Sequence, residues 1–545
     1  MKTTNTELQT LLFPTRIVKT KGSVSSPETL LIKREPIVVL KERYFTRLEK
    51  KGEENPYVLL DFGREIHGSV RLNIANLTKG RNNHIIHLTF GESVSEALSK
   101  VGEKGATNDH SPRDFDVMIS KLSNVEYGQT GFRFLRMELI EEGFVDIRNV
   151  VAISKTANIE QKGYFHSSDA EFDKILDVAT YTCYLNLQDG VIWDGVKRDR
   201  LVWAGDLNNE ILTLMYQYGD VENVRNSLDF LRDNTAEHCW MNTIPSYSAW
   251  WVFCHLNYYR FCADRDYLNE NMDRINSILR DLDLCIEPDE CDFTRTGDEG
   301  HMPYYLDWPT RDTDDAKPGT MLLIGLIAQT VLDIGADGMD LAAAKSIVDK
   351  LAHYKNASVQ MKQTLALRTV CGGRDPQACE RLEAEGARGF STFMSYFLLK
   401  GLSMAGSEKA VKLAKEYYGA MLSRGATTFW EDFDMDWLEG SGRIDEEPQA
   451  GERDLHGDYG KFCYLGLRHS FCHGWASGVV AWAFEELAGV KVLEAGYKKV
   501  SIKPDLRELE WIDVKIPTPH GDIRIEARRG SEPKITLPAG VELVD

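Results

Sequence analysis

Several common signatures are missing from these 545 residues. The N-terminal stretch has no apolar run long enough for a signal peptide, and the most apolar segment, residues 321–334, is interrupted by Gln329 and Asp333. No C-x-x-C pair, H-E-x-x-H motif or Cys/His tetrad is present, and no glycine-rich phosphate loop opens a helix after a strand. We therefore expect a cytoplasmic protein that uses no metal and no cofactor.

Basic residues are also in short supply. The chain has 64 Lys and Arg against 84 Asp and Glu, a net charge of −20, which argues against nucleic acid or an anionic membrane as a partner. Most of the ten cysteines fall in apolar or helical contexts, so we expect reduced core thiols. Cys285 and Cys291 flank an acidic loop and are the one pair considered for a disulfide. The sequence leaves homo-oligomerisation open.

The order of the chain predicts three parts. A length of 545 residues suggests about two to four domains. Residues 1–162 show short strand-like alternation, as at Val70, Leu72 and Ile74, with frequent glycine and asparagine turns, which is typical of a β-sandwich. Residues 489–545 return to alternation around a turn at Pro517–Gly521 and predict a small C-terminal β-sandwich.

The middle part, residues 163–488, reads as helical. Ser168 is a candidate N-cap with Glu171 three residues on, and apolar residues keep helical spacing from there to about residue 188. About a dozen helices in ~300 residues fit an (α/α)6 barrel, which opens a pocket at one end of its inner ring. Further helices are expected at about 207–218, 221–234, 246–263, 267–286, 319–335, 339–356, 389–404, 408–423 and 470–487.

One connection between these helices, Asp194 to Asp206, concentrates chemistry. It reads Asp-Gly-Val-Lys-Arg-Asp-Arg-Leu-Val-Trp-Ala-Gly-Asp. Each residue also has an ordinary structural interpretation: Asp194 as a turn residue, Asp206 at a helix N-terminus, Arg198 and Arg200 as counter-charges. These interpretations stay open beside the functional one.

Three further segments place acidic or histidine side chains beside tryptophan. They are residues 427–434 around Trp430 and Glu431, residues 307–312 beginning Asp307-Trp308, and residues 469–475 with His469 and His473. The first could equally be a surface loop, and either histidine a helix cap. The run Asp432, Asp434, Asp436 is not an EF-hand, because the glycine at the sixth position is missing and Arg443 stands at the twelfth.

Together these loops favour work on sugars. Glycoside hydrolysis needs one carboxylic acid to protonate the leaving oxygen and one carboxylate as base or nucleophile, and tryptophan rings stack on the apolar faces of sugars. Two other functions remain: another barrel glycosidase or phosphorylase with a different sugar specificity, and a non-catalytic carbohydrate-binding or scaffold protein.

The residues of these loops also resemble a known family. The 194–206 run is similar to the signature of bacterial α-L-rhamnosidases of glycoside hydrolase family 78. Residues 61–71, Phe90-Gly-Glu92 and Gly131–Phe134 resemble the β-sandwich that precedes that family's barrel, and three later motifs match in order: Gly425–Glu431, His473-Gly-Trp475 and Thr518–Gly521. The resemblance covers nearly the whole chain from about residue 55.

The resemblance implies an (α/α)6 barrel enzyme that inverts configuration and releases terminal α-L-rhamnose from small glycosides or oligosaccharides without a catalytic metal. It implies that Asp199 is the general acid and Glu431 the general base. Many members carry glutamate at the acid position, where this chain offers aspartate. The substrate-binding residues it implies, with neighbouring aromatics, are Asp194, Arg198, Trp203, Asp206, Asp307, Trp308, Trp430 and His473.

Two finer expectations follow. If Asp199 is the acid, its pKa must be raised. Arg198 and Arg200 would oppose that, so we expect them to pair with Asp194, Asp206 or the substrate, and Asp199 to face a tryptophan-lined wall. The short C-terminal β domain and the lack of extra N-terminal β modules favour a small glycoside over a polymer.

Overall fold

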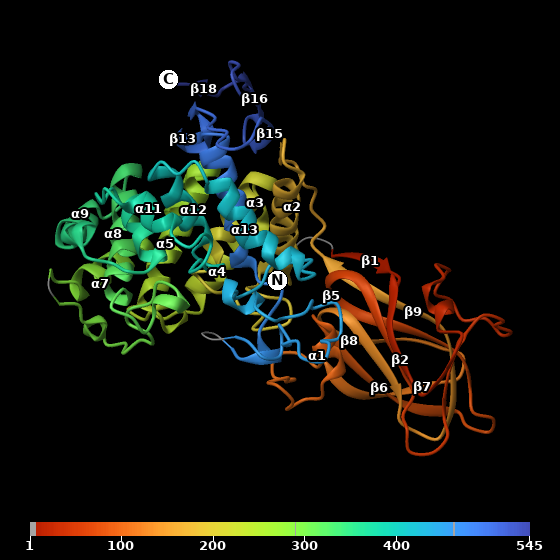
Figure 1. Ribbon diagram of the computed structural model, residues 1–545. Helices are drawn as coiled ribbons and strands as arrows, with labels where there is room; N and C mark the ends of the chain where they lie inside the picture. Colours follow the sequence, from red (N-terminus) through yellow and green to blue (C-terminus); the bar gives the residue numbers. More distant parts are fainter. Residues whose placement is uncertain (1–6, 289, 461–463, 545) are drawn as a thin grey trace.

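The computed structural model describes residues 7–288, 290–460 and 464–544. It has three regions (Figure 1): an N-terminal β region, a central helical body, and small β sheets on the helical body at the C-terminus. The predicted order of β-sandwich, helical barrel and small β domain is confirmed.

The N-terminal region is a bent antiparallel sheet of nine strands. Strand β5 pairs with β8 along most of its length, with β2 before residue 62 and with β9 from Gly68 onward. The change of partner occurs at Gly68, where a Cβ atom would lie 1.9 Å from the Ile153 carbonyl oxygen, so only glycine fits. The strands are β1 (Leu8–Leu12), β2 (Arg16–Lys21), β3 (Ser23–Ser25), β4 (Thr46–Lys50), β5 (Tyr57–Leu77), β6 (Asn83–Gly91), β7 (Asp114–Ser120), β8 (Ser123–Leu139) and β9 (Gly143–Thr156).

The apolar residues of the predicted alternation are buried in this sheet. Val70, Leu72 and Ile74 are at most 1% exposed, but Ser69 and Asn73 on the other face of β5 are buried as well. Phe132 and Phe90 pack edge to face in the same core, with their ring centres 4.8 Å apart. A short helix, α1 (Val94–Leu98), leaves the sheet toward the helical body, and its Val94 amide donates to the Ile444 carbonyl at 2.9 Å. The β region is therefore fixed against the loops of the helical body.

The helical body begins one residue later than expected. Asp169, not Ser168, is the N-cap of α2, and its carboxylate accepts the amides of Glu171 and Phe172. The long helices are α2 (Ala170–Leu185), α3 (Leu207–Gln217), α4 (Glu222–Asp233), α5 (Pro245–Cys262), α7 (Met272–Cys285), α8 (Ala316–Ile334), α9 (Leu341–Leu351), α12 (Ser395–Met404) and α13 (Ala410–Ser423). The shorter ones are α6 (Arg265–Glu270), α10 (Lys362–Val370), α11 (Ala378–Glu383) and α14 (Gly478–Trp482).

Several boundaries differ from the prediction. The expected helix at 267–286 is broken at Asn271 into α6 and α7, and residues 470–473 lie outside the last helix because the chain there carries His473 into a pocket. Helices α10 and α11 were not predicted. The nine described cysteines are all free, so Cys285 and Cys291 form no disulfide. Helix α8 is long and apolar enough to cross a membrane by length and composition alone, but 56% of that stretch is buried among other helices.

The C-terminal region holds two small sheets. One has the order β10-β15-β16-β17 and the other β13-β14-β18. Strand β10 (Tyr164–Ser167) precedes the helical body in the sequence and pairs with β15 (Trp511–Thr518), which follows it. The predicted turn at Pro517–Gly521 joins β15 to β16 (Gly521–Arg528). The remaining strands are β13 (Val490–Glu494), β14 (Lys499–Ile502), β17 (Lys534–Thr536) and β18 (Glu542–Leu543).

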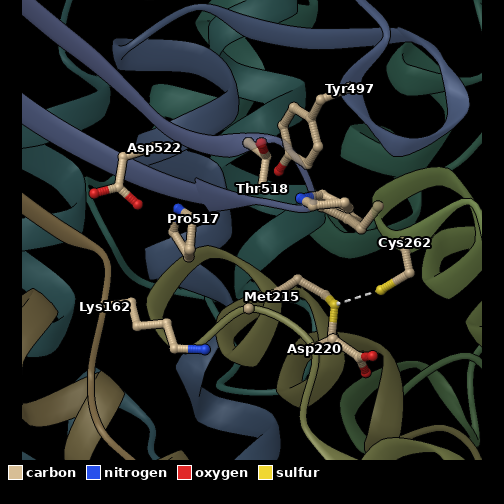
Figure 2. Close-up of a pocket in the computed structure, with 11 residues that line it drawn as sticks. Lys162, Met215, Asp220, Cys262, Tyr497, Pro517, Thr518 and Asp522 are labelled. Atoms are coloured by element: carbon tan, nitrogen blue, oxygen red, sulfur yellow. Dashed lines mark hydrogen bonds between the residues drawn. The ribbon is translucent and has the colours of Figure 1, made fainter. Parts of the chain in front are cut away.

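A crevice of about 800 Å³ separates this region from the helical body (Figure 2). Its floor is formed by Met215 near the C-terminal end of α3 and Cys262 at the end of α5, and its other wall by Tyr497 and the turn at Pro517-Thr518. Because Asp206 stands at the N-terminal end of α3, the C-terminal sheets lie at the opposite end of this helix from the 194–206 loop.

Candidate active site

A pocket of about 530 Å³, open to solvent, lies at the N-terminal end of α3. Four segments line it: the 194–206 loop, the N-terminal end of α5, the loop before α8, and the long connection from α13 to α14. The lining residues are Asp194, Asp199, Trp203, Asp206, Ile244, Tyr247, Met302, Tyr305, Trp308, Glu431, Tyr464, His473 and Trp475. The pocket brings together seven of the ten residues chosen from the sequence.

Asp194 holds the loop in shape and also lines the pocket. Its carboxylate accepts the backbone amides of Asp199 at 3.1 Å and Leu201 at 2.9 Å, and its carbonyl accepts the Gly474 amide at 2.8 Å. Asp194 therefore acts as the turn residue that was considered from the sequence. Its backbone carbonyl also ties the loop to the segment that carries His473.

Asp206 occupies the N-cap position of α3 but makes no side-chain capping hydrogen bond. Its Oδ1 instead lies 3.6 Å from Nδ1 of His473, whose Nε2 lies 3.6 Å from Asp194. Burial raises the pKa of Asp206 well above its ordinary value. Burial lowers the pKa of His473, but Asp194, Glu431 and Asp206 outweigh burial, and the net shift is upward. These three side chains form a buried polar wall suited to holding hydroxyl groups.

Arg198 joins the two carboxylates that the sequence selects for catalysis. Its Nη1 donates to Asp199 Oδ1 at 2.9 Å, and its Nη2 donates to Glu431 Oε2. Its Nε donates to the Arg468 carbonyl at 2.7 Å, and its guanidinium lies 3.6 Å from the ring centre of Tyr464. The expectation that Arg198 would avoid Asp199 is wrong.

Arg200, by contrast, turns away from the carboxylates. Its guanidinium donates to the carbonyls of Val196 at 3.1 Å and Gln129 at 2.7 Å and lies over the Trp193 ring. The expected pairing of Arg200 with Asp194, Asp206 or the substrate is also wrong. Its guanidinium instead donates its hydrogen bonds to these backbone carbonyls, at the junction with the β region.

The surroundings shift Asp199 and Glu431 in opposite directions. Burial raises the pKa of Asp199, and the negative charges of Asp194 and Glu431 add to this against Arg198. Burial would also raise the pKa of Glu431, but Arg198, His473 and His469 outweigh burial and lower it to about 2. One carboxyl thus retains its proton more readily than an ordinary aspartate, while the other is ionised, which is the arrangement that acid–base catalysis requires.

Aromatic side chains form the rest of the pocket. Trp203 packs edge to face with Tyr247 at 6.0 Å, and Trp308 with Tyr305 at 5.2 Å. Both tryptophans are partly exposed, and the guanidinium of Arg311 lies over the Trp308 ring, 5.3 Å from its centre. Such walls suit the apolar faces of a sugar ring.

Three of the ten residues chosen from the sequence do not line the pocket: Arg198, Trp430 and Asp307. Trp430 is fully buried and stacks on Phe471 at 4.3 Å, so it belongs to the core beneath Glu431 and does not line the pocket. Asp307 is also buried; it accepts the Trp308 amide at 2.8 Å and the Ser391 hydroxyl. Burial raises the pKa of Asp307 to about 7. Its place in the structure is to hold Trp308, not to touch a ligand.

Sequence reasoning missed other pocket residues. Trp475 belonged to a motif that had been noted, and Tyr305 precedes Asp307-Trp308 by two residues, so an aromatic search of the same segments would have found both. Tyr464, Tyr247, Ile244 and Met302 carry no local signal, because only the fold brings them to the pocket.

Behind the pocket, a buried charge cluster joins the β region to the helical body. Lys197 Nζ lies 2.9 Å from Glu92 and 3.3 Å from Glu96, and donates to the Leu467 and His469 carbonyls at 3.0 and 2.5 Å. Glu92, Glu96 and His456 have ligand atoms close enough to hold a metal ion, but the Lys197 ammonium already supplies the positive charge there. The cluster holds Lys197, the residue before Arg198, in place.

Comparisons with known proteins agree with this fold. Residues 160–365 match the bacterial alpha-L-rhamnosidase 6 hairpin glycosidase domain, and residues 489–543 match the bacterial alpha-L-rhamnosidase C-terminal domain. An alpha-L-rhamnosidase of Alteromonas sp. (strain LOR) is 24% identical over 95% of this chain and 58% of its own length.

Solved structures show the same fold. A family 78 rhamnosidase of Bacillus sp. GL1 aligns with a TM-score of 0.69 and 19% identity over 95% of this chain and 56% of that one. A rhamnosidase from Klebsiella oxytoca aligns with a TM-score of 0.69 and 19% identity over 89% of this chain and 96% of that one. This protein thus spans little more than half of the Alteromonas and Bacillus proteins. The helical body and the C-terminal region of this chain thus match two domains that are characteristic of bacterial α-L-rhamnosidases, and the solved rhamnosidases share its fold.

Proposed function

We propose that this protein is an exo-acting, inverting α-L-rhamnosidase that releases terminal rhamnose from small glycosides. The observation that carries the proposal is the opposite shift of two carboxyls in one pocket: the pKa of Asp199 is raised, first by burial, and that of Glu431 is lowered to about 2 by Arg198 and two histidines against burial. Environments that separate two carboxyls in this way assign the acid and the base.

The proposed reaction is a single displacement. Asp199 donates its proton to the glycosidic oxygen as the bond to the anomeric carbon breaks, and Glu431 takes a proton from the water that attacks the opposite face. Arg198 contacts both carboxylates, so it holds their relative positions. Asp194, Asp206 and His473 are placed to accept or donate hydrogen bonds to sugar hydroxyls.

The walls of the pocket support a small substrate. Trp203 and Trp308 line its sides together with Tyr247 and Tyr305, and aromatic walls of this kind suit a single sugar ring. The Klebsiella oxytoca rhamnosidase, which has this fold, was solved with rhamnose bound, and this supports rhamnose as the sugar in the pocket.

A panel of p-nitrophenyl glycosides followed by proton NMR tests the proposal. We expect cleavage of the α-L-rhamnoside, with β-L-rhamnose appearing before mutarotation. Appearance of the α anomer first would contradict inversion, and cleavage of a different glycoside alone would contradict the sugar assignment. Turnover that requires inorganic phosphate would show a phosphorylase instead.

A further inference from the structure

A histidine of the β region approaches the proposed acid from outside the pocket. His110 lies in the segment between α1 and β7, and its Nε2 is 3.5 Å from Oδ1 of Asp199. The same nitrogen is 3.4 Å from Oδ2 of Asp109, which in turn pairs with Arg468 at 2.6 Å. His110 is thus the group through which the N-terminal region meets the proposed acid.

Both neighbours of Asp199 approach the same oxygen. Arg198 Nη1 donates to Oδ1 at 2.9 Å, and His110 Nε2 faces Oδ1 from the β region. An oxygen that already accepts from Arg198 and has an imidazole nitrogen 3.5 Å away is a poor place for a proton, so the proton of the neutral acid belongs on Oδ2.

We propose that His110 is a positioning residue for the catalytic acid: its N–H directs the proton of Asp199 to Oδ2 and stabilises the carboxylate left after the proton is transferred. This rests on the proposed role of Asp199. In the step itself, the Oδ2–H bond breaks, the proton goes to the glycosidic oxygen, and the electron pair stays on a carboxylate whose Oδ1 accepts from Arg198 and lies 3.5 Å from His110 Nε2.

The segment that carries His110 is held firmly enough for this role. Ser111 next to it is buried, and its hydroxyl lies 2.7 Å from the Thr130 hydroxyl and donates to the Lys197 carbonyl at 3.2 Å. Arg113 is 3% exposed and donates to the carbonyls of Phe90 and Glu96. The histidine therefore comes from an anchored part of the β region that is also bonded to the residue before Arg198.

The charged groups around this pair are known. Asp199 is faced by Arg198, Asp194 and Glu431 from the helical body, by the ring of Tyr464, and by His110 from the β region. His110 is faced by Asp109 and Asp199, with Arg468 beyond Asp109. A hydrogen bond to the ionised form lowers the pKa of a carboxyl, so loss of the imidazole should raise that of Asp199.

The test compares His110→Ala and His110→Gln in the full chain, with His87→Gln as the matched control. His87 bonds to Asp114, which accepts the Val101 amide of the same segment, so the control disturbs the neighbouring packing without facing Asp199. The ionisation of Asp199 is followed by carbon-13 NMR of labelled aspartate carboxyls, with Asp199→Asn to assign the signal.

We expect the midpoint of the Asp199 titration to rise by about 0.5–1 pH unit in His110→Ala, because the loss of one weak donor to the carboxylate is worth roughly that much. It should return toward the parent value in His110→Gln, whose amide can donate, and stay unchanged in His87→Gln. An unchanged midpoint in His110→Ala overturns the inference, whether or not the protein cleaves rhamnosides.

A second measurement follows catalysis. General acid assistance matters most when the departing alcohol is a poor leaving group. We expect His110→Ala to lower kcat about 10-fold on an alkyl rhamnoside, with little change on p-nitrophenyl rhamnoside and in KM. Equal losses on both substrates would overturn the inference. Failure of the parent protein to cleave either substrate would instead refute the proposed function, and the NMR arm would still decide the role of His110.

Discussion

Arg198 and Glu431 are 233 residues apart in the sequence, yet the guanidinium of the first donates a hydrogen bond to the carboxylate of the second. The same guanidinium holds Asp199 at 2.9 Å. One always charged guanidinium thus spans the proposed acid and the proposed base. It lowers the pKa of Glu431 to about 2, whereas burial and like charges outweigh it at Asp199 and the pKa there is raised.

Removal of either proposed catalytic carboxyl should abolish most activity. Asp199→Asn and Glu431→Gln keep shape but cannot transfer a proton, so we expect kcat to fall by about 10²–10⁴-fold in each. Steady-state kinetics on p-nitrophenyl α-L-rhamnoside checks this. Asp432→Asn is the control: this residue is next to Glu431, is buried and does not line the pocket, so near-parent kcat is expected. Equal loss in all three variants would contradict the assignment.

Replacement of Arg198 by methionine should move the whole pH profile upward. Glu431 acts in its ionised form, so activity is lost as pH falls through its pKa of about 2. Without the cation that pKa rises, and the acid limb of kcat/KM moves to higher pH. Asp199 acts in its protonated form, and its alkaline limb also moves up, because Arg198 lowers the pKa of Asp199.

Arg200→Met provides the comparison for this profile. Its guanidinium donates to backbone carbonyls at the domain junction and not to either carboxylate. We expect both limbs of the profile to stay in place, and a shift equal to that of Arg198→Met would show that general charge, not the bridge, sets the profile.

The two kinds of tryptophan in this region should behave differently. Trp308 lines the pocket and is partly exposed, so Trp308→Ala should raise KM about 10-fold with little loss of stability. Trp430 is fully buried, so Trp430→Ala should lower the free energy of unfolding by about 3–5 kcal/mol. Kinetics together with urea unfolding separates the two; a KM effect confined to Trp430→Ala would reverse the assignment.

Loss of the buried ammonium should weaken the junction of the regions. Lys197→Met leaves Glu92 without its cation, while Arg113 remains 3.7 Å from Glu96, and an unpaired buried charge costs about 3–5 kcal/mol. Thermal unfolding near neutral pH checks this loss. Addition of Glu92→Gln to the variant should recover part of it, and a double variant less stable than the single one would argue against the ion pair as the cause.

The periodic parts of this structure could be predicted from the sequence, and the parts made by distant segments could not. Alternation at Val70, Leu72 and Ile74 located a strand, because successive side chains of a strand point to opposite faces and every second residue shares one face. The 194–206 loop was found because its residues are consecutive. The direction of Arg198 was mispredicted, since its partners Glu431 and the Arg468 carbonyl lie more than 230 residues away.

Tryptophan was the least reliable signal of binding. Trp308 and Trp430 both stand beside an acidic residue in the sequence, yet one lines the pocket and the other stacks on Phe471 in the core. An indole is large and apolar enough for either place, so only the packing around it decides. His110 lay beyond sequence reasoning altogether, because a β region was not expected to face the acid.

The pairing of β10 with β15 sets an order of events during synthesis. Tyr164 and Asp513, bonded at 3.3 Å across these strands, are 349 residues apart. At the usual elongation rate of about 5–20 residues per second, β10 leaves the ribosome roughly 20–70 s before its partner strand exists. During that interval the edge of β10 is unpaired and can pair with other chains. Formation of the C-terminal sheets ends this exposure. We therefore expect nascent chains that stop before residue 511 to aggregate.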